Sequence, residues 1–237
     1  MPFMKKYNIS IKISTLSILA FIIIYYSQLI AMPKVINLTA IPYSIATPNN
    51  LDIKYHKLIS YYIRFYLKGN QLPKLISRSK YFLQYILIEL KKRKLPTELA
   101  LLPIIESTYK PAAISNKGAY GIWQISYVTG KRYGLIYANQ DSRADLTAST
   151  NAALKYLEFL YKKFDKDWLL ALAAYNAGEG RISKAIKNNK ILGKDANYWT
   201  LSLPEETKHY VPKLLALSII FNNPDHFGLE SILKEAY

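Results

Sequence analysis

The chain contains no cysteine and only three histidines among its 237 residues. The absence of thiols excludes disulfides, cysteine-ligated metals, thiol catalysis and a lipidated N-terminal cysteine. The histidines are far apart and do not have the spacing of a metal-ligand set: His56, His209 and His226. We therefore expect neither a metal nor another cofactor.

Acidic residues are also scarce, at 16 against 32 basic residues, which gives a net charge of +16. Residues 52–98 alone hold eleven Lys or Arg and three acids. Such an excess favours an anionic partner, either nucleic acid, a membrane surface or an acidic polymer. A biased coding composition, rich in Lys, Ile, Asn and Tyr together, explains the same charge without a partner. The sequence leaves both explanations open.

An apolar run from Leu16 to Ile30 follows a basic start that includes Lys5, Lys6 and Lys12. Its length of about fifteen residues is below the roughly 20 that a spanning helix requires. Residues 1–31 are therefore predicted to be an export signal cleaved near Ala31, or else an uncleaved N-terminal membrane anchor. Both alternatives place the rest of the chain in the periplasm or cell envelope, which argues against nucleic acid as the partner.

The rest of the sequence predicts an all-α protein. Three prolines mark residues 32–50 as a linker. Beyond it, apolar residues recur at helical spacing, without sustained alternation or a long repeat. The second helix is expected to begin at Ser77 or Ser79, and the third to bend at Pro103. Helices are predicted at residues 51–67, 77–94, 96–109, 122–133, 147–163, 168–177, 182–188 and 205–222.

Glu106 is the first candidate for chemistry, because it lies at the end of the apolar segment LALLPIIE. A carboxyl held against apolar groups has its charged form disfavoured, so its pKa rises toward neutrality. A general acid needs such a raised pKa. On its own the position does not decide the matter, since most helical glutamates simply face water.

Three neighbouring patterns allow alternative interpretations. Ser107 to Lys110 matches the S-x-x-K nucleophile signature of penicillin-binding proteins, but the companion motifs S-D-N and K-T-G are absent. Gly118 to Gln124 allows a tight turn, with Trp123 as a core residue and Gln124 able to grip an amide or hydroxyl group. Ala173 to Gly178 ends a helix on a glycine, where Tyr175 and Asn176 are either plain packing or polar groups of a site.

Taken together, these segments form an ordered signature that resembles the catalytic domain of soluble lytic transglycosylases, most like the membrane-bound murein transglycosylase D group. The resemblance covers roughly Leu51 to Phe227. Its motifs are Glu106-Ser107, Gly118-x-x-Gly121-x-Trp123-Gln124, Ala174-Tyr175-Asn176-Ala177-Gly178, Asp141 to Asp145 with Ala148 to Thr150, and Leu203 to Thr207 with Tyr210 to Lys213.

The resemblance implies a fold like that of goose-type lysozyme and cleavage of the β-1,4 bond between N-acetylmuramic acid and N-acetylglucosamine. Cleavage would proceed without net hydrolysis and leave 1,6-anhydro ends, with Glu106 acting first as acid and then as base. By the same match, Ser107 and Tyr175 would orient the glutamate or the acetamido group. Gln124, Asn176 and Tyr210 would line the glycan groove.

The resemblance also implies a division of the chain and a partner. We expect an N-terminal helical extension at residues 51–94, a catalytic domain at residues 95–227 and a tail at residues 228–237. Longer relatives carry LysM repeats that bind peptidoglycan, and none is expected here.

Asp145 is interpreted as structural, paired with Arg143. The expected partner is the peptidoglycan glycan strand. The alternatives are a hydrolytic, lysozyme-type muramidase and a non-catalytic wall-binding protein.

Overall fold

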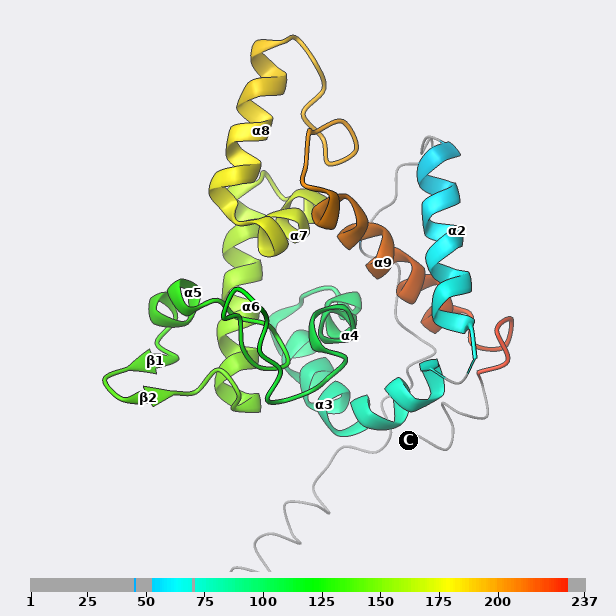
Figure 1. Ribbon diagram of the computed structural model, residues 1–237, viewed down its shortest axis with the longest axis vertical. Helices are drawn as coiled ribbons and strands as arrows, with labels where there is room; N and C mark the ends of the chain where they lie inside the picture. The colour runs from blue at the N-terminus through cyan, green and yellow to red at the C-terminus, as the bar shows by residue number, and fades with distance from the viewer. Residues whose placement is uncertain (1–44, 46–52, 70, 230–237) are drawn as a thin grey trace, which may run out of the picture. The chain divides into compact units, whose positions relative to one another are not determined.

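The computed structural model describes residue 45, residues 53–69 and residues 71–229. The predicted export segment and tail lie outside these residues, except for residues 228 and 229, and so does most of the predicted linker. The elements in chain order are α2 (Ile53–Leu67), α3 (Gln71–Arg93), the 3-10 helix η2 (Thr97–Leu101), α4 (Leu102–Ser107), α5 (Tyr127–Arg132), β1 (Ile136–Tyr137), β2 (Gln140–Asp141), α6 (Leu146–Lys163), α7 (Trp168–Ala177), α8 (Glu179–Ile191) and α9 (Glu205–Asn222) (Figure 1).

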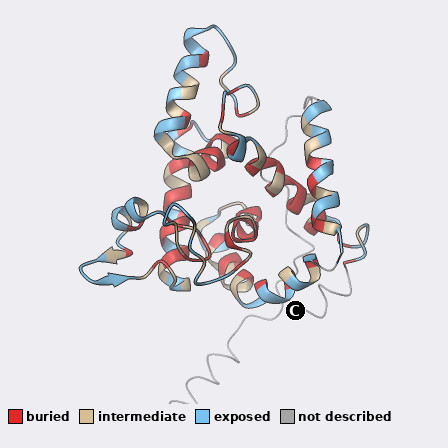
Figure 2. Ribbon diagram, viewed as in Figure 1, coloured by how far each residue is buried: buried red, intermediate tan, exposed pale blue. Residues whose placement is uncertain are grey.

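The core is built around α7, which packs against α6, α8 and α9. Residues 169–174 of α7 are all buried, and α9 is buried along most of its length (Figure 2). The helix begins where the Asp167 side chain accepts hydrogen bonds from the backbone N–H groups of Leu169 and Leu170, and it ends at Gly178. This apolar helix therefore fixes the positions of the polar residues at its C-terminal end.

The helix that carries Glu106 is short and is held between α9 and η2. The predicted single helix at residues 96–109 is in fact the 3-10 helix η2 followed by α4, with the change at Leu102, one residue before Pro103. Helix α4 ends at Ser107 because Thr108 and Tyr109 adopt left-handed backbone conformations, with φ of 52° and 56°. Glu106 consequently lies in the final turn.

Three predicted helix starts are wrong. The helix predicted at residues 182–188 is α8, which begins earlier, at Glu179, and ends later, at Ile191. Helix α3 begins at Gln71, several residues before Ser77. Pro73 is compatible with this start, because it lies in the first turn, where its missing N–H leaves no intrahelical hydrogen bond unmade. The predicted helix at residues 122–133 forms only from Tyr127. Before it, Tyr120 and Ile125 exchange backbone hydrogen bonds of 3.1 Å that close a tight loop. Ser126 then caps α5 by accepting from the Thr129 N–H at 3.1 Å.

The prediction of an all-α fold is confirmed apart from one small feature, the two-stranded antiparallel pair β1–β2. Strands of two residues are too short to show an alternating pattern in a sequence. Among the described residues, no helix is both long enough and apolar enough to cross a membrane. The same residues hold no cluster of three or more His, Cys, Asp or Glu that could bind a metal ion.

Candidate active site

Glu106 opens onto a pocket with a volume of about 590 Å³. The pocket is walled by α4, the loop at residues 115–126, the N-terminal part of α5, the middle of α6, the C-terminal end of α7 and the start of α9. These segments span 102 positions of the chain, from Ile105 to Glu206. Four of the predicted site residues meet there: Glu106, Gln124, Tyr175 and Asn176.

Tyr210 of α9 is the direct partner of the Glu106 carboxyl group. Its buried hydroxyl donates a hydrogen bond of 2.5 Å to Glu106 Oε1. Tyr210 had been predicted to line the glycan groove, but the structure places it against Glu106, and it is not among the pocket-lining residues. The hydrogen bond occupies one carboxyl oxygen and leaves Oε2 as the oxygen available to a ligand.

Burial raises the pKa of Glu106 from 4.5 to about 7. The Tyr210 hydrogen bond and the positive charge of Lys213 lower this pKa, whereas the nearby Glu206 carboxylate raises it. Burial, and then the proximity of Glu106, raise the pKa values of Tyr175 and Tyr210 well above 10. Both phenols therefore stay protonated at neutral pH, while Glu106 is poised between its two protonation states.

Gln124 and Tyr175 are held by the loop that faces Glu106. Gln124 has a φ of 47°, and its Nε2 donates to the carbonyl oxygens of Ala113 at 3.0 Å and Gly121 at 2.8 Å. The Tyr175 hydroxyl donates to the Trp123 carbonyl at 2.8 Å. The hydrogen bond from Tyr175 thus joins the loop at residues 115–126 to the C-terminal end of α7, next to Glu106.

Asn176 connects α7 to α9. Its Oδ1 accepts from the Thr207 hydroxyl at 2.8 Å, and its Nδ2 approaches Glu206 Oε1 at 3.5 Å. Thr207 belongs to the Leu203 to Thr207 motif, so this hydrogen bond joins that motif to the Ala174 to Gly178 motif. The two segments build one wall of the pocket.

Ser107 does not line the pocket. Its hydroxyl donates to the carbonyl oxygens of Ile122 at 2.9 Å and Pro103 at 3.3 Å, and so it fastens the end of α4 to the glycine-containing loop. Lys110 is exposed beyond the end of α4. The S-x-x-K interpretation is therefore wrong, because the serine hydroxyl faces backbone carbonyls instead of the lysine.

The glycine-containing loop is held by Arg143, and the predicted pairing of Arg143 with Asp145 is wrong. Arg143 pairs with Asp141 (Nη2 to Oδ2, 2.8 Å), and not with Asp145. Its Nη1 also donates to the carbonyl oxygens of Gly118 at 2.8 Å and Ile125 at 2.9 Å. Asp145 instead caps α6 by accepting from the Ala148 N–H. The guanidinium thus pairs the Gly118 carbonyl and adds a second hydrogen bond to the Ile125 carbonyl, which also accepts from the Tyr120 N–H.

Trp123 is confirmed as a core residue. It is fully buried, and its indole N–H donates to the Thr150 hydroxyl of α6 at 3.0 Å. Thr150 belongs to the Ala148 to Thr150 motif. This hydrogen bond connects the Gly118 to Gln124 motif with the Ala148 to Thr150 motif and fixes the loop against α6.

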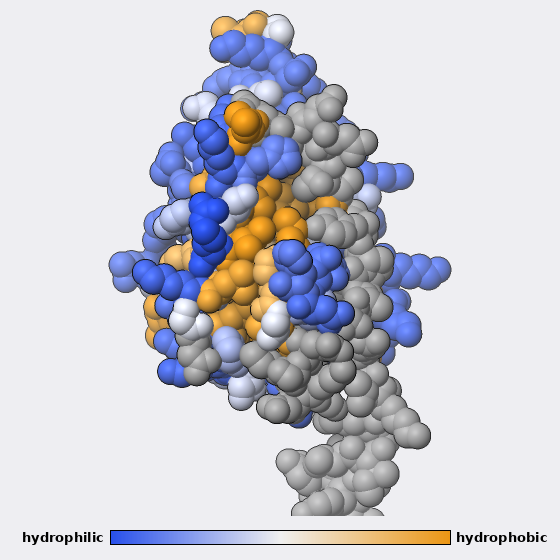
Figure 3. Space-filling view, turned by 90° about the vertical axis from the view of Figure 1, so that its right-hand side faces the viewer, coloured by the Kyte–Doolittle hydropathy of each residue, from blue (hydrophilic) through white to orange (hydrophobic). Residues whose placement is uncertain are grey.

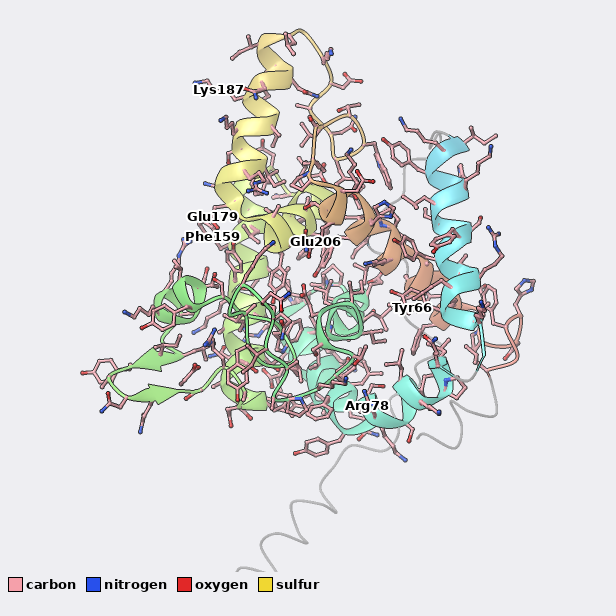
Figure 4. All side chains as sticks on the ribbon, viewed as in Figure 1. Tyr66, Arg78, Phe159, Glu179, Lys187 and Glu206 are labelled. Carbon is pink, nitrogen blue, oxygen red and sulfur yellow. The ribbon has the colours of Figure 1, made fainter. Side chains whose placement is uncertain are left out.

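Glu206 is the main pocket residue that the sequence analysis did not single out, although its motif was noted. It lies in the first turn of α9 and is labelled in Figure 4. Its side chain is 68% exposed and lies 3.8 Å from the Lys117 ammonium, which comes from the opposite loop. The pocket therefore holds a second carboxylate. The sequence does not reveal this, because Glu206 is far from Glu106 along the chain.

Replacing Tyr210 with Phe should shift the pH dependence of catalysis. Activity that needs protonated Glu106 falls as pH rises above about 7. Removing the phenol removes a hydrogen bond that favours the ionised form, so the pKa of Glu106 rises and the falling limb moves to higher pH. A hydrogen bond to a charged group contributes about 1.5–3 kcal/mol, which corresponds to a shift of about one pH unit or more. The kcat/KM profile measures this shift, and an unchanged limb would contradict it.

Comparisons with known proteins agree with this geometry. Residues 85–198 match the transglycosylase SLT domain family. The chain is 52% identical over 153 residues to membrane-bound lytic murein transglycosylase D of Escherichia coli K12, covering 64% of this chain and 34% of that protein. It is 32% identical over 118 residues to the soluble lytic murein transglycosylase of the same strain, covering 47% of this chain and 18% of that protein.

The fold has a counterpart among solved structures. The 70 kDa soluble lytic transglycosylase of Escherichia coli superposes with a TM-score of 0.50 at 20% identity, over 78% of this chain and 39% of that one. In sequence, the match to membrane-bound lytic murein transglycosylase D spans about a third of the length of that relative. Residues 85–198, the segment that matches the transglycosylase SLT domain family, include Glu106, Gln124, Tyr175 and Asn176.

Proposed function

We propose that this chain is a peptidoglycan lytic transglycosylase that cleaves the β-1,4 bond between N-acetylmuramic acid and N-acetylglucosamine without net hydrolysis. The observation that carries the proposal is a carboxyl with a pKa of about 7, half-buried at the edge of a pocket and held by a tyrosine hydroxyl. About half of such groups are protonated at neutral pH. The same residue can then give a proton and take one back.

In the first step, Glu106 donates its proton to the bridging oxygen as the bond from that oxygen to C1 of N-acetylmuramic acid breaks. The oxygen leaves as the 4-hydroxyl of N-acetylglucosamine. The substrate's own 2-acetamido group stabilises the positive charge at C1. Because Tyr210 occupies Oε1, Oε2 is the oxygen that carries the transferable proton.

In the second step, the C6 hydroxyl of the same sugar attacks C1, and ionised Glu106 accepts its proton. The product is a 1,6-anhydromuramoyl end, and the enzyme returns to its protonated state. Both steps use one carboxyl group, whereas ordinary glycosidases divide them between two.

The other pocket residues supply positioning. The Nε2 of Gln124 is used by two loop carbonyls, so Gln124 offers its Oε1 as an acceptor, and Asn176 offers its amide group. Both suit the N-acetyl and hydroxyl groups of the sugar. We assign Tyr175 to holding the acetamido group beside Glu106, and Ser107 to holding the α4 turn that carries the acid.

A hydrolytic, lysozyme-type reaction is the second candidate, and Glu206 is the observation that favours it. A carboxylate in the same pocket could activate water, as in two-carboxyl glycosidases. Its high exposure and its contacts with Lys117 and Asn176 support a substrate-binding role instead.

Replacing Glu206 with Gln separates the two candidates. For a transglycosylase we expect the variant to retain activity within about tenfold, because losing one exposed contact costs about 1 kcal/mol or less. A hydrolase would lose 100-fold or more with its general base. Digestion of purified sacculi followed by mass spectrometry of the muropeptides gives both the rate and the product. Anhydro ends lack one water relative to hydrated ends, and hydrated ends from the wild type would overturn the proposal.

We also propose a location in the cell envelope, where the substrate lies. The basic, apolar N-terminal segment supports export, with residues 1–31 either cleaved or kept as an anchor. We further propose that residues 95–227 form the catalytic domain and residues 51–94 an extension. Helix α2 of this extension packs along α9, the helix that supplies Tyr210, and so supports the site from behind.

A further inference from the structure

The C-terminal end of α8 exposes two adjacent aliphatic side chains. Ile191, the last residue of the helix, is 71% exposed, and Leu192, its C-cap, is 65% exposed. Hydrophobic surface is visible at the end of α8, at the top of Figure 3, beside hydrophilic surface. Single exposed aliphatic residues are common on proteins, but an adjacent pair at a projecting helix end presents one continuous apolar surface.

Lysines surround this pair. Lys187 and Lys190 precede it and Lys194 follows it, and all three are exposed. Lys187, labelled in Figure 4, projects outward from α8. Residues 184–195 contain four lysines and a single acid, Asp195. We call residues 187–194 the α8 tip. Attraction to the helix dipole accounts for a lysine in the last turn, but not for the exposed aliphatic pair beside it.

The α8 tip has a defined conformation. The buried Asn189 side chain donates to the carbonyl oxygens of Asp195 at 2.7 Å and Thr200 at 3.2 Å. The Lys194 N–H bonds back to the Asn189 carbonyl at 2.9 Å, across the turn at Gly193, where φ is +64°. These hydrogen bonds hold the segment after α8 against the Asn189 side of the helix end. Ile191 and Leu192 are therefore held outward before any partner binds.

We propose that the α8 tip docks on an anionic phospholipid membrane, with Ile191 and Leu192 entering the interface and the lysines contacting the lipid phosphates. Aliphatic side chains flanked by lysines are the chemistry that suits a negatively charged lipid surface. The carboxylates of a wall polymer would match the lysines but give the aliphatic pair nothing to contact. The proposal does not depend on the catalytic assignment.

The geometry connects this docking surface to the candidate active site. Gly178 lines the pocket, and α8 runs from the next residue to the tip over 13 residues. At 1.5 Å per residue, the helix spans about 20 Å. Docking through the α8 tip would therefore hold the pocket at most about 20 Å from the lipid surface.

The lack of cysteine permits a direct test on the full chain. Leu192→Cys, labelled with an environment-sensitive fluorophore, reports insertion of the tip itself, independently of any anchoring by the N-terminal segment. Tyr137→Cys, at an 80% exposed position in β1, carries the same label as a control. Each protein is titrated with vesicles of phosphatidylcholine alone and with vesicles containing phosphatidylglycerol.

We expect a blue shift for the label at position 192 on the anionic vesicles, and none for the label at position 137. The apparent affinity of this signal should fall about fivefold for each of Lys187→Gln, Lys190→Gln and Lys194→Gln, and should fall with added salt. Replacing the exposed lysines Lys155 and Lys162 of α6 by Gln should leave it within about twofold.

Three results would overturn the proposal. These are no shift at position 192, an equal shift on neutral vesicles, or a shift with purified sacculi but not with vesicles. The last result would identify a wall polymer as the partner of the tip. None of these measurements uses glycan cleavage, so their failure is distinct from failure of the proposed enzymatic function.

Discussion

Glu106→Gln should lower kcat/KM on purified sacculi by about 100- to 10,000-fold, the range that a positioned general acid contributes. The amide keeps the size of the carboxyl and can still accept the Tyr210 hydrogen bond, but it has no proton to transfer at neutral pH. Release of soluble muropeptides measures the loss. The matched control is Glu205→Gln, one residue before Glu206 on α9, where the side chain is 74% exposed and pairs with Lys208 and His209 outside the pocket.

A variant with full activity would exclude both the transglycosylase and the lysozyme-type reaction, since each needs this proton. A wild-type protein that binds sacculi but releases nothing would instead support the non-catalytic alternative. The comparison requires that the variant is folded, and the electrostatics of the site predict that it is.

The raised pKa of Glu106 has a defined effect on stability. The unfolded chain loses the Glu106 proton near pH 4.5, and the folded chain near pH 7. Between these values the folded state binds more protons, so the free energy of unfolding falls as pH rises. The full shift corresponds to at most about 3 kcal/mol, and partial exposure reduces it. Glu106→Gln should thus have a melting temperature at pH 8 equal to or above that of the wild type.

The second large effect is expected at Gly121. A Cβ at this position would lie 2.1 Å from the Arg143 carbonyl oxygen and 3.0 Å from its carbonyl carbon. The glycine also has a φ of +83°, which other residues adopt only with strain. Strain and overpacking together predict that Gly121→Ala lowers the free energy of unfolding by about 2–6 kcal/mol. Since a native domain is stable by only about 5–15 kcal/mol, this loss removes a large share of the stability and should lower the melting temperature markedly.

Gly118→Ala is the matched control for this prediction. Gly118 has a similar φ of +74°, but a Cβ there would meet nothing within 4 Å. It should therefore cost only the backbone strain, about 1 kcal/mol. Thermal unfolding followed by circular dichroism compares the two variants. Equal losses would show that the contact with Arg143 does not determine the requirement for glycine at position 121.

The elements that the sequence predicted well are those whose signals are local. The boundaries of α7 and α9 agree with the predicted residues 168–177 and 205–222, because Asp167 and Gly178 flank α7 and Pro204 directly precedes α9. The start of α5 was missed because the hydrogen bonds between Tyr120 and Ile125, and the positive φ of Gln124, stop a helix that periodicity favours. The β1–β2 pair was missed because it is too short to carry a pattern.

Periodicity and motif order were enough to establish the helical class and to single out Glu106, through its apolar neighbours and its position ahead of the later motifs. The chemistry of that carboxyl depends instead on contacts made in the folded protein. Tyr210, which donates to it, is 104 residues away, and Glu206 and Lys213 lie on the same distant helix. The requirement for glycine at position 121 likewise arises from folding, because Gly121 makes room for the backbone carbonyl of Arg143. The physical reason is the same in both cases: helix formation depends on neighbours within a turn, whereas burial, pKa and close packing depend on segments that meet only on folding.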